Sequence, residues 1–321
     1  MKASILRPLL LLAALLPILS ACSRDDGLAI LSISAGGPPA TRSGASAIDC
    51  DSVSDLTVFV FRSDGTLENN GRSSGNSLSL ALSRENGKRL YLIANGPDGI
   101  ETCTDEAQLT ALCTLLSDQQ SGAFTMAWTQ TLDVAGDASL DVEIPRIAAQ
   151  VRLERITNRS LLPLKLHAAY LTNVPVAQAP LFTPGDYTPS TWANCLSHSD
   201  SAYDGWLFDD LGGTVLAPGE SLEGVHLFYS LPNPLGTDRF GGPWSPRLTR
   251  LVIEAEMEGV RYYYPFTFDN LLANHRYTLV NLNITRPGSN DPDVPVDPRD
   301  ATLRVDLLGW REAYYAYTDP I

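Results

Sequence analysis

Short apolar runs separated by Gly, Pro, Asn and Asp recur along most of the chain, whereas helical periodicity is scarce. Runs of this kind are typical of antiparallel strands that pack face to face as sandwiches. Residues 56–61 (Leu-Thr-Val-Phe-Val-Phe) are apolar on both faces and run into Ser63-Asp64-Gly65, which predicts a central strand followed by a hairpin turn. The fold class is therefore predicted to be mainly β.

The remaining runs divide the chain into two strand-rich units that meet near Pro145. In the first unit, Asn86-Gly87 predicts a turn between two strands. The second unit opens with an alternating strand that places Ile147, Ala149, Val151 and Leu153 on one face. Other strands are predicted at residues 77–82, 89–94, 124–129, 140–144, 164–171, 222–231, 248–257, 260–268 and 277–284, with a turn at Glu258-Gly259.

One helix is predicted after residue 103, where Thr104 can cap and the leucines at 109, 112, 115 and 116 form one apolar stripe. If Cys103 and Cys113 both lie on it, they are about 15 Å apart, too far to bridge directly. With Cys50 and Cys195 they allow three pairings, and we expect buried thiols or one long-range disulfide.

Two isolated amphipathic strands bracket these units. Residues 28–35 place Ala29, Leu31, Ile33 and Ala35 on one face, and a loose segment, 36–44, follows. Residues 287–300 form an acidic, proline-spaced linker that we expect to be extended and solvated. A detached strand, 301–310, comes after the linker, with Leu303, Val305 and Leu307 facing one way.

The N-terminus has the layout of a secretory signal: basic Lys2 and Arg7, an apolar run at 9–19, and small residues before Cys22. The run is too short to span a bilayer. Leu19-Ser20-Ala21-Cys22 resembles the bacterial lipobox, in which the cysteine is acylated and tethers the protein to a membrane. An ordinary signal peptide cut near Ala21, with an incidental cysteine, is the alternative.

Charge and motifs exclude several function classes. The net charge of −14 would repel a phosphate backbone, so nucleic acid is not an expected partner. No catalytic motif, metal-ligand spacing or cofactor fingerprint is found, so no enzyme activity, metal or cofactor is expected. Asp291, Asp293, Asp297 and Asp300 lack the pattern of a calcium loop.

Cutting the loose segment after Arg42 would release the first strand and leave an apolar groove with an open sheet edge. The C-terminal strand of another copy could fill this groove by β-augmentation. Alternatively, both strands simply complete their own domains.

These residues resemble the fimbrillin family of type V pili from Bacteroidales. The matching pieces cover most of the chain: the lipobox at Cys22, Thr41-Arg42, residues 56–61 with Asp64-Gly65, residues 90–96, 149–154 and 171–175, and residues 274–277. The resemblance implies two transthyretin-like antiparallel β-sandwich domains in tandem, with one or two short helices. It also implies a lipoprotein precursor that a trypsin-like protease cuts between Arg42 and Ser43.

Carried over, the resemblance divides the chain into a signal peptide (1–21), a lipidated leader with the first strand (22–44), two sandwich domains (45–145 and 146–286) and a linker with a donor strand (287–321). Ala29, Leu31 and Ile33 would leave the groove, and Leu303, Val305 and Leu307 would fill it. The expected partners are other copies or paralogous subunits, in a fimbrium on the surface of the outer membrane.

Two features leave the role open. Family cleavage sites read Arg-Ala, whereas this chain has Arg42-Ser43, and anchor-type relatives keep their lipid uncut. Stalk, tip and anchor roles therefore remain alternatives. A monomeric surface lipoprotein is a further one, binding a glycan or host protein through the aromatic residues Trp192, Trp206, Phe208 and Trp244, although such aromatics more often pin a loop to its own domain.

Overall fold

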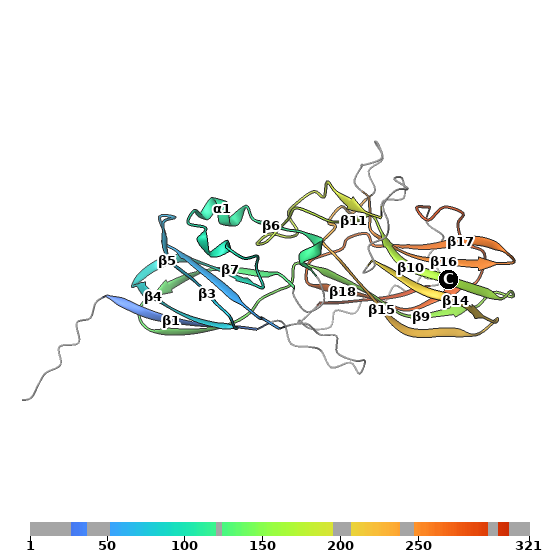
Figure 1. Ribbon diagram of the computed structural model, residues 1–321, viewed down its shortest axis with the longest axis horizontal. Helices are drawn as coiled ribbons and strands as arrows, with labels where there is room; N and C mark the ends of the chain where they lie inside the picture. The colour runs from blue at the N-terminus through green and yellow to red at the C-terminus, as the bar shows by residue number, and fades with distance from the viewer. Residues whose placement is uncertain are drawn as a thin grey trace, which may run out of the picture.

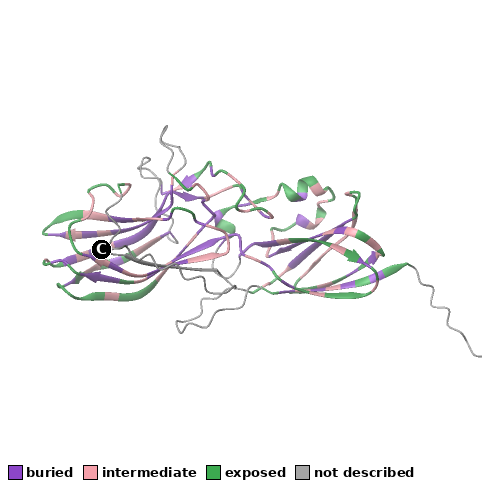
Figure 2. Cartoon of the chain, turned by 180° about the vertical axis from the view of Figure 1, so that it is seen from behind, coloured by how far each residue is buried: buried purple, intermediate pink, exposed green. Residues whose placement is uncertain are grey.

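Two β-sandwiches lie end to end in the computed structural model (Figure 1). The structure describes residues 27–36, 52–119, 124–194, 207–237 and 247–294, and the backbone of 301–307. Buried positions concentrate between the sheets of each sandwich (Figure 2). The predicted mainly β sandwich fold is confirmed.

The first sandwich packs a three-stranded sheet, β4-β1-β8, against a four-stranded sheet, β3-β2-β5-β7. The pairing is antiparallel except between β1 and β8. The strands are β1 (Leu28–Gly36), β2 (Leu56–Phe61), β3 (Leu67–Ser73), β4 (Ser77–Ser83), β5 (Glu85–Ala94), β7 (Met126–Val134) and β8 (Ala138–Glu143).

β2 is buried along its whole length, as the continuous apolar run predicted. Val58 and Val60 face β1 and its sheet, whereas Phe59 and Phe61 belong to the hydrophobic core on the other side. That other side is covered by three short helical segments, η1 (Ile100–Thr102), α1 (Glu106–Thr110) and η2 (Leu116–Asp118). A central strand covered on both faces has no polar face to present to water, which explains the missing alternation.

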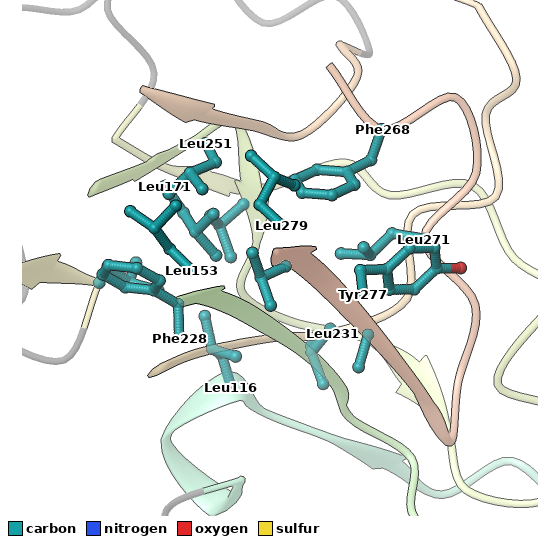
Figure 3. Close-up of a cluster of buried hydrophobic side chains, with 14 of the residues drawn as sticks. Leu116, Leu153, Leu171, Phe228, Leu231, Leu251, Phe268, Leu271, Tyr277 and Leu279 are labelled. Atoms are coloured by element: carbon teal, nitrogen blue, oxygen red, sulfur yellow. The ribbon is translucent and has the colours of Figure 1, made fainter. Parts of the chain in front are cut away.

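The second sandwich packs β14-β10-β16-β17 against β15-β9-β18-β19. Leu153 and Leu279 of one sheet meet Leu171 and Leu251 of the other in its core (Figure 3). β9 and β18 pair in parallel, and Glu258 and Gly259, both at positive φ, form the predicted turn between β16 and β17. The strands are β9 (Ala149–Asn158), β10 (Leu164–Thr172), β14 (Phe208–Leu216), β15 (Ser221–Ser230), β16 (Arg250–Met257), β17 (Val260–Thr267), β18 (His275–Ile284) and β19 (Ala301–Leu307).

One hydrophobic cluster continues from the first sandwich into the second. β6 (Cys113–Thr114) pairs with β12 (Ala179–Pro180), and the rings of Tyr91 and Phe182 meet edge to face, 5.1 Å apart. A further short pair joins β11 (Val174–Pro175) to β13 (Trp192–Ala193). Backbone pairing together with shared apolar burial fixes one sandwich against the other.

The predicted helix is shorter than its leucine stripe suggested. α1 spans five residues, and its N-cap is Asp105 rather than Thr104, with the Asp105 carboxylate accepting a hydrogen bond from the Gln108 amide at 2.8 Å. The chain then becomes extended because Cys113 and Thr114 pair with β12, which leaves Leu115 exposed. The helical separation of the two cysteines therefore does not apply.

Cys113 does not meet the expectation of a buried thiol or a disulfide, whereas Cys103 is partly buried and packs against the core. Cys103 and Cys113 carry free thiols, and Cys113 is exposed. The other two, Cys50 and Cys195, lie outside the described residues.

Two other predictions need correction. β4 and β5 belong to different sheets, so they form no hairpin, and Asn86-Gly87 lies inside β5 at a β-bulge between Glu85 and Lys88. No strand was predicted between residues 171 and 222, but this stretch contains a full edge strand, β14. Gly212 and Gly213, both at positive φ, interrupt its alternation at the bulge opposite β10.

A buried lysine fixes the end of the first sandwich where β1 begins. Lys88 is fully buried, and its ammonium donates to Glu68, to Ser83 at 3.0 Å and to Glu85 at 3.1 Å. Burial raises the pKa of Glu68, but hydrogen bonds from Lys88 and Ser83 outweigh this effect and hold that pKa below its ordinary value. Glu68 therefore stabilises the fold above its unfolded-state pKa, and this contribution is lost as the pH falls through its folded-state pKa.

Replacing Lys88 by Ala should lower the free energy of unfolding by about 3 kcal/mol, because the buried Glu68 carboxylate keeps its hydrogen bond from the Ser83 amide but loses the ammonium, and the nearest described cation is then Arg62, 3.8 Å away. Urea denaturation at neutral pH measures this loss. The deficit should shrink as the pH falls and Glu68 takes up a proton, because a neutral carboxyl no longer needs the ammonium. The double variant Lys88→Met with Glu68→Leu is the control and should be close to the wild type in stability. Equal losses in both variants would show that packing, not charge, explains the effect.

Candidate functional site: the first strand and its groove

β1 is the central strand of its sheet (Figure 1). It pairs antiparallel with β4, from Leu28 opposite Ser83 to Ser34 opposite Ser77, and parallel with β8 over residues 31–36. β4 and β8 are held together in this sheet by β1 alone. Removing β1 would therefore expose two strand edges at once, and unpaired edges are templates for another strand.

The inward side chains of β1 fill a groove in the core. Ala29, Leu31, Ile33 and Ala35 are at most 3% exposed. Along the strand their sizes run small, large, large, small. They pack in one cluster with residues of both sheets, including Val58, Leu80, Leu82, Leu92 and Val142. Burial of Leu31 and Ile33 alone contributes roughly 3–6 kcal/mol before entropy costs.

Both ends of β1 remain hydrogen-bonded to the body. The Arg84 amide donates to the Gly27 carbonyl at 3.2 Å, and the Ile144 amide donates to the Gly36 carbonyl at 2.9 Å. Near the first end, the Ile30 amide donates to the Asp137 carboxylate at 2.8 Å. Cys22, Arg42 and Ser43 lie outside the described residues, Arg42 six positions after Gly36 in the sequence.

The sequence predicted a detached C-terminal strand, but the strand is paired in the structure. β19 pairs antiparallel with β18, with Leu303 opposite Leu279, Val305 opposite Tyr277 and Leu307 opposite His275. It lies at the edge of its sheet and has one neighbour, whereas β1 has two. Both terminal strands therefore pair within their own chain in this structure.

The first half of the acidic linker is docked rather than solvated. Ser289 exchanges two backbone hydrogen bonds with Tyr263 at 2.8 and 2.9 Å. The Asp293 carboxylate accepts from the Asn173 amide at 3.1 Å and from the buried Arg250 guanidinium at 3.4 Å. The acidic residue at position 293 therefore serves as the ion-pair partner of Arg250. Asp297 and Asp300 lie outside the described residues.

The described aromatic candidates pack internally. Trp192 is 6% exposed, and the ring of Phe208 stacks on Tyr170 with centroids 6.0 Å apart. Trp206 and Trp244 lie outside the described residues. Within the described ranges, no group of three or more His, Cys, Asp or Glu side chains is arranged to hold a metal ion. No helix of those ranges has the length and apolarity needed to cross a bilayer.

The two-sandwich fold is similar to several solved structures. A Bacteroides eggerthii DSM 20697 protein whose proposed role is cell adhesion has a TM-score of 0.62 and 20% identity, over 87% of this chain and 94% of that one. A Parabacteroides distasonis ATCC 8503 protein with the same proposed role has a TM-score of 0.60 and 15% identity, over 90% and 98%. A fimbrilin from Porphyromonas gingivalis W83 has a TM-score of 0.58 and 15% identity, over 86% and 95%.

No family model matches the sequence, and no curated protein matches it. The structural likeness at these identities concerns the fold. It confirms the architecture that the resemblance to fimbrillins implied: this chain has the tandem-sandwich fold of a fimbrilin and of proteins with a proposed adhesion role.

Proposed function

We propose that the chain is a structural subunit of a bacterial surface fimbrium that supports adhesion. It is exported as a lipoprotein through Cys22 and anchored in the outer membrane. A trypsin-like protease then cuts between Arg42 and Ser43, and subunits assemble by β-strand exchange. The position of β1 supports this most directly, because a strand near the lipidated end forms the centre of a sheet with Arg42 in the segment that follows it.

Cleavage would turn β1 from a part of the chain into a bound peptide. The body would keep β4 and β8, whose inner edges then lack a partner, around a groove shaped by Ala29, Leu31, Ile33 and Ala35. Such a groove favours another strand of alternating apolar residues, whose backbone supplies the hydrogen bonds and whose side chains fill the pockets.

The C-terminal strand of another copy has the required alternation, with Leu303, Val305 and Leu307 on one side. This strand, β19, lies at the edge of its own sheet, so its departure from that sheet breaks only the pairing with β18. Burying three or four such side chains contributes roughly 5–10 kcal/mol before entropy costs. A joint between unlike surfaces does not close on itself and therefore produces a filament.

The fold comparison supports the same function. The similar structures include a fimbrilin and proteins with a proposed adhesion role. The partners of this chain would be further copies or paralogous subunits. Adhesion through loop aromatics as a separate function has no support in the described residues, because Trp192 and Phe208 pack internally.

Limited trypsin digestion of the purified precursor should produce ladders of head-to-tail polymers. Cleavage at Arg42 removes the covalent tether of β1, and the strand can then be replaced. Gel electrophoresis without boiling detects the ladders, and mass spectrometry should find Ser43 at the new N-terminus. Arg42→Gln should prevent both. Complete cleavage at Arg42 without any ladder would contradict the assembly mechanism.

Deleting residues 301–321 should abolish the ladders while leaving cleavage at Arg42 unchanged, because the groove opens but no donor strand remains. The deleted chain should still act as the terminal acceptor when mixed with intact subunits. Ladders of undiminished length from the deleted chain alone would exclude the C-terminal strand as the donor.

Leu31→Ala should lower the free energy of unfolding of the uncleaved precursor by about 2–5 kcal/mol, because it leaves a cavity in the groove. After cleavage, the weakened strand should leave sooner and ladders should form faster. Ile30→Ala is the matched control: Ile30 is 46% exposed on the opposite face, so both stability and assembly should change little. Unfolding curves and time-resolved gels measure the two effects. Equal behaviour of the two variants would show that the groove does not control assembly.

A further inference from the structure

The outer face of the β1 sheet carries a patch of serines, which we call the serine patch. It contains Ser32 and Ser34 of β1, Ser77 and Ser79 of β4, and Ser139 of β8. Ser32 lies between Ser79 and Ser139 in one row across the sheet, and the Ser32 and Ser79 hydroxyls are 3.0 Å apart. In the next row, Ser34 lies between Ser77 and Asp141.

The serine patch is hollow because its side chains are short. A depression of about 340 Å³ lies over it, lined by the five serines with Ile33 and Leu78. Asp141 neighbours the patch in the row of Ser34, and the Asp137 carboxylate binds the Ile30 amide, so acids border the patch. A side chain that projects outward from the position of Ser32 has space, hydroxyl partners and nearby negative charge.

The size order of the groove predicts how a replacing strand aligns. Ala301 and Leu303 are the same residue types as Ala29 and Leu31, and Val305 is one methylene smaller than Ile33. Only Leu307 exceeds its counterpart, Ala35. Moving the strand by two residues puts Ala301 in the Leu31 site or Leu303 in the Ala29 site, which leaves a cavity or overpacks. Facing the strand the other way would bury Thr302, Arg304 and Asp306.

In this alignment, Arg304 takes the place of Ser32. Because residue 304 is the middle of the segment 301–307 and residue 32 the middle of 29–35, the position is the same if the strand runs in the reverse direction. Of the three outward side chains Thr302, Arg304 and Asp306, the one cation therefore lies over the serine patch. In this register Asp306 takes the place of Ser34, in the row of Asp141, if the strand runs as β1 does, and the place of Ile30, near Asp137, if it runs in reverse. The charge of Asp306 therefore does not favour this register over a shifted one, and the size order of the groove is what selects it.

We propose that the serine patch binds the Arg304 side chain of a second copy of this chain and that, together with the size order of the groove, it sets the register of the exchanged strand. The proposal rests on the strand exchange proposed above. In the joined state, Ser79 and Ser139 of the accepting copy accept hydrogen bonds from the guanidinium, and Asp141 supplies opposite charge from the neighbouring row. Hydroxyl and carboxylate oxygens suit the five N–H donors of an arginine.

Disulfide trapping tests the register directly. Accepting subunits carry one cysteine on β4 (Ser77→Cys, Ser79→Cys or Ala81→Cys), donating subunits carry Arg304→Cys, and Cys50, Cys103, Cys113 and Cys195 are replaced by serine in both. Facing positions on paired strands are close enough to bridge. After trypsin cleavage, mixing and mild oxidation, Ser79→Cys should give the dominant cross-linked dimer.

Each other outcome has a distinct meaning. A dominant bridge at Ser77→Cys or Ala81→Cys, or joined subunits without any bridge, would overturn the register while leaving strand exchange intact. If no joint forms in the parent chain, the proposed function itself fails. Ser139→Glu should slow dissociation of the joint by up to about fivefold and Ser139→Lys should speed it similarly, as expected for one exposed cross-strand charge pair. The same changes at Thr131, which is exposed on β7 in the opposite sheet, should have little effect.

Discussion

Pairing of β1 with both β4 and β8 is the interaction on which the first sandwich depends. The chain places these two strands on either side of β1 and gives them no pairing with each other in that sheet. Backbone hydrogen bonds and the burial of four alternate side chains therefore depend on one nine-residue strand. Without β1, the facing edges of β4 and β8 would have unpaired N–H and C=O groups, and neither strand would be stable alone. The sheet therefore exists only while some strand fills its centre.

The rest of the molecule does not share this dependence. The opposite sheet keeps its four strands and is covered on its outer side by the helical segments around Leu109 and Leu116. The same apolar cluster continues through β6 and β12 into the second sandwich. Loss of β1 would thus remove one sheet's centre while a continuous core still holds the two sandwiches together. That division suits a subunit that exchanges a strand without unfolding.

The parts of the fold that follow from local pattern were predictable. Continuous burial of β2 and the turn at Glu258 follow from neighbouring residues, and the alternation of Leu31 and Ile33 marks an inner face without any knowledge of the partner strands. Long-range pairing was not predictable. The end of the leucine stripe is extended because β6 pairs with β12, and Asp293 is docked because Arg250, 43 residues earlier, donates a hydrogen bond to it. The groove is likewise visible only once β4 and β8 are placed.

The need for a cut follows from the difference between the two terminal strands. β1 is covalently attached next to its groove, so its effective concentration there is millimolar or higher, and a strand from another subunit cannot compete at ordinary protein concentrations. In the proposed mechanism, cleavage after Arg42 removes this advantage without changing a single contact. The released strand could then dissociate and be diluted in the solvent. The donor strand β19, in contrast, stays covalently linked to its own subunit through the acidic linker, which is docked on that subunit at Ser289 and Asp293. In this proposal, proteolysis would drive exchange by changing connectivity, and the groove would need no higher intrinsic affinity for the donor than for the leader.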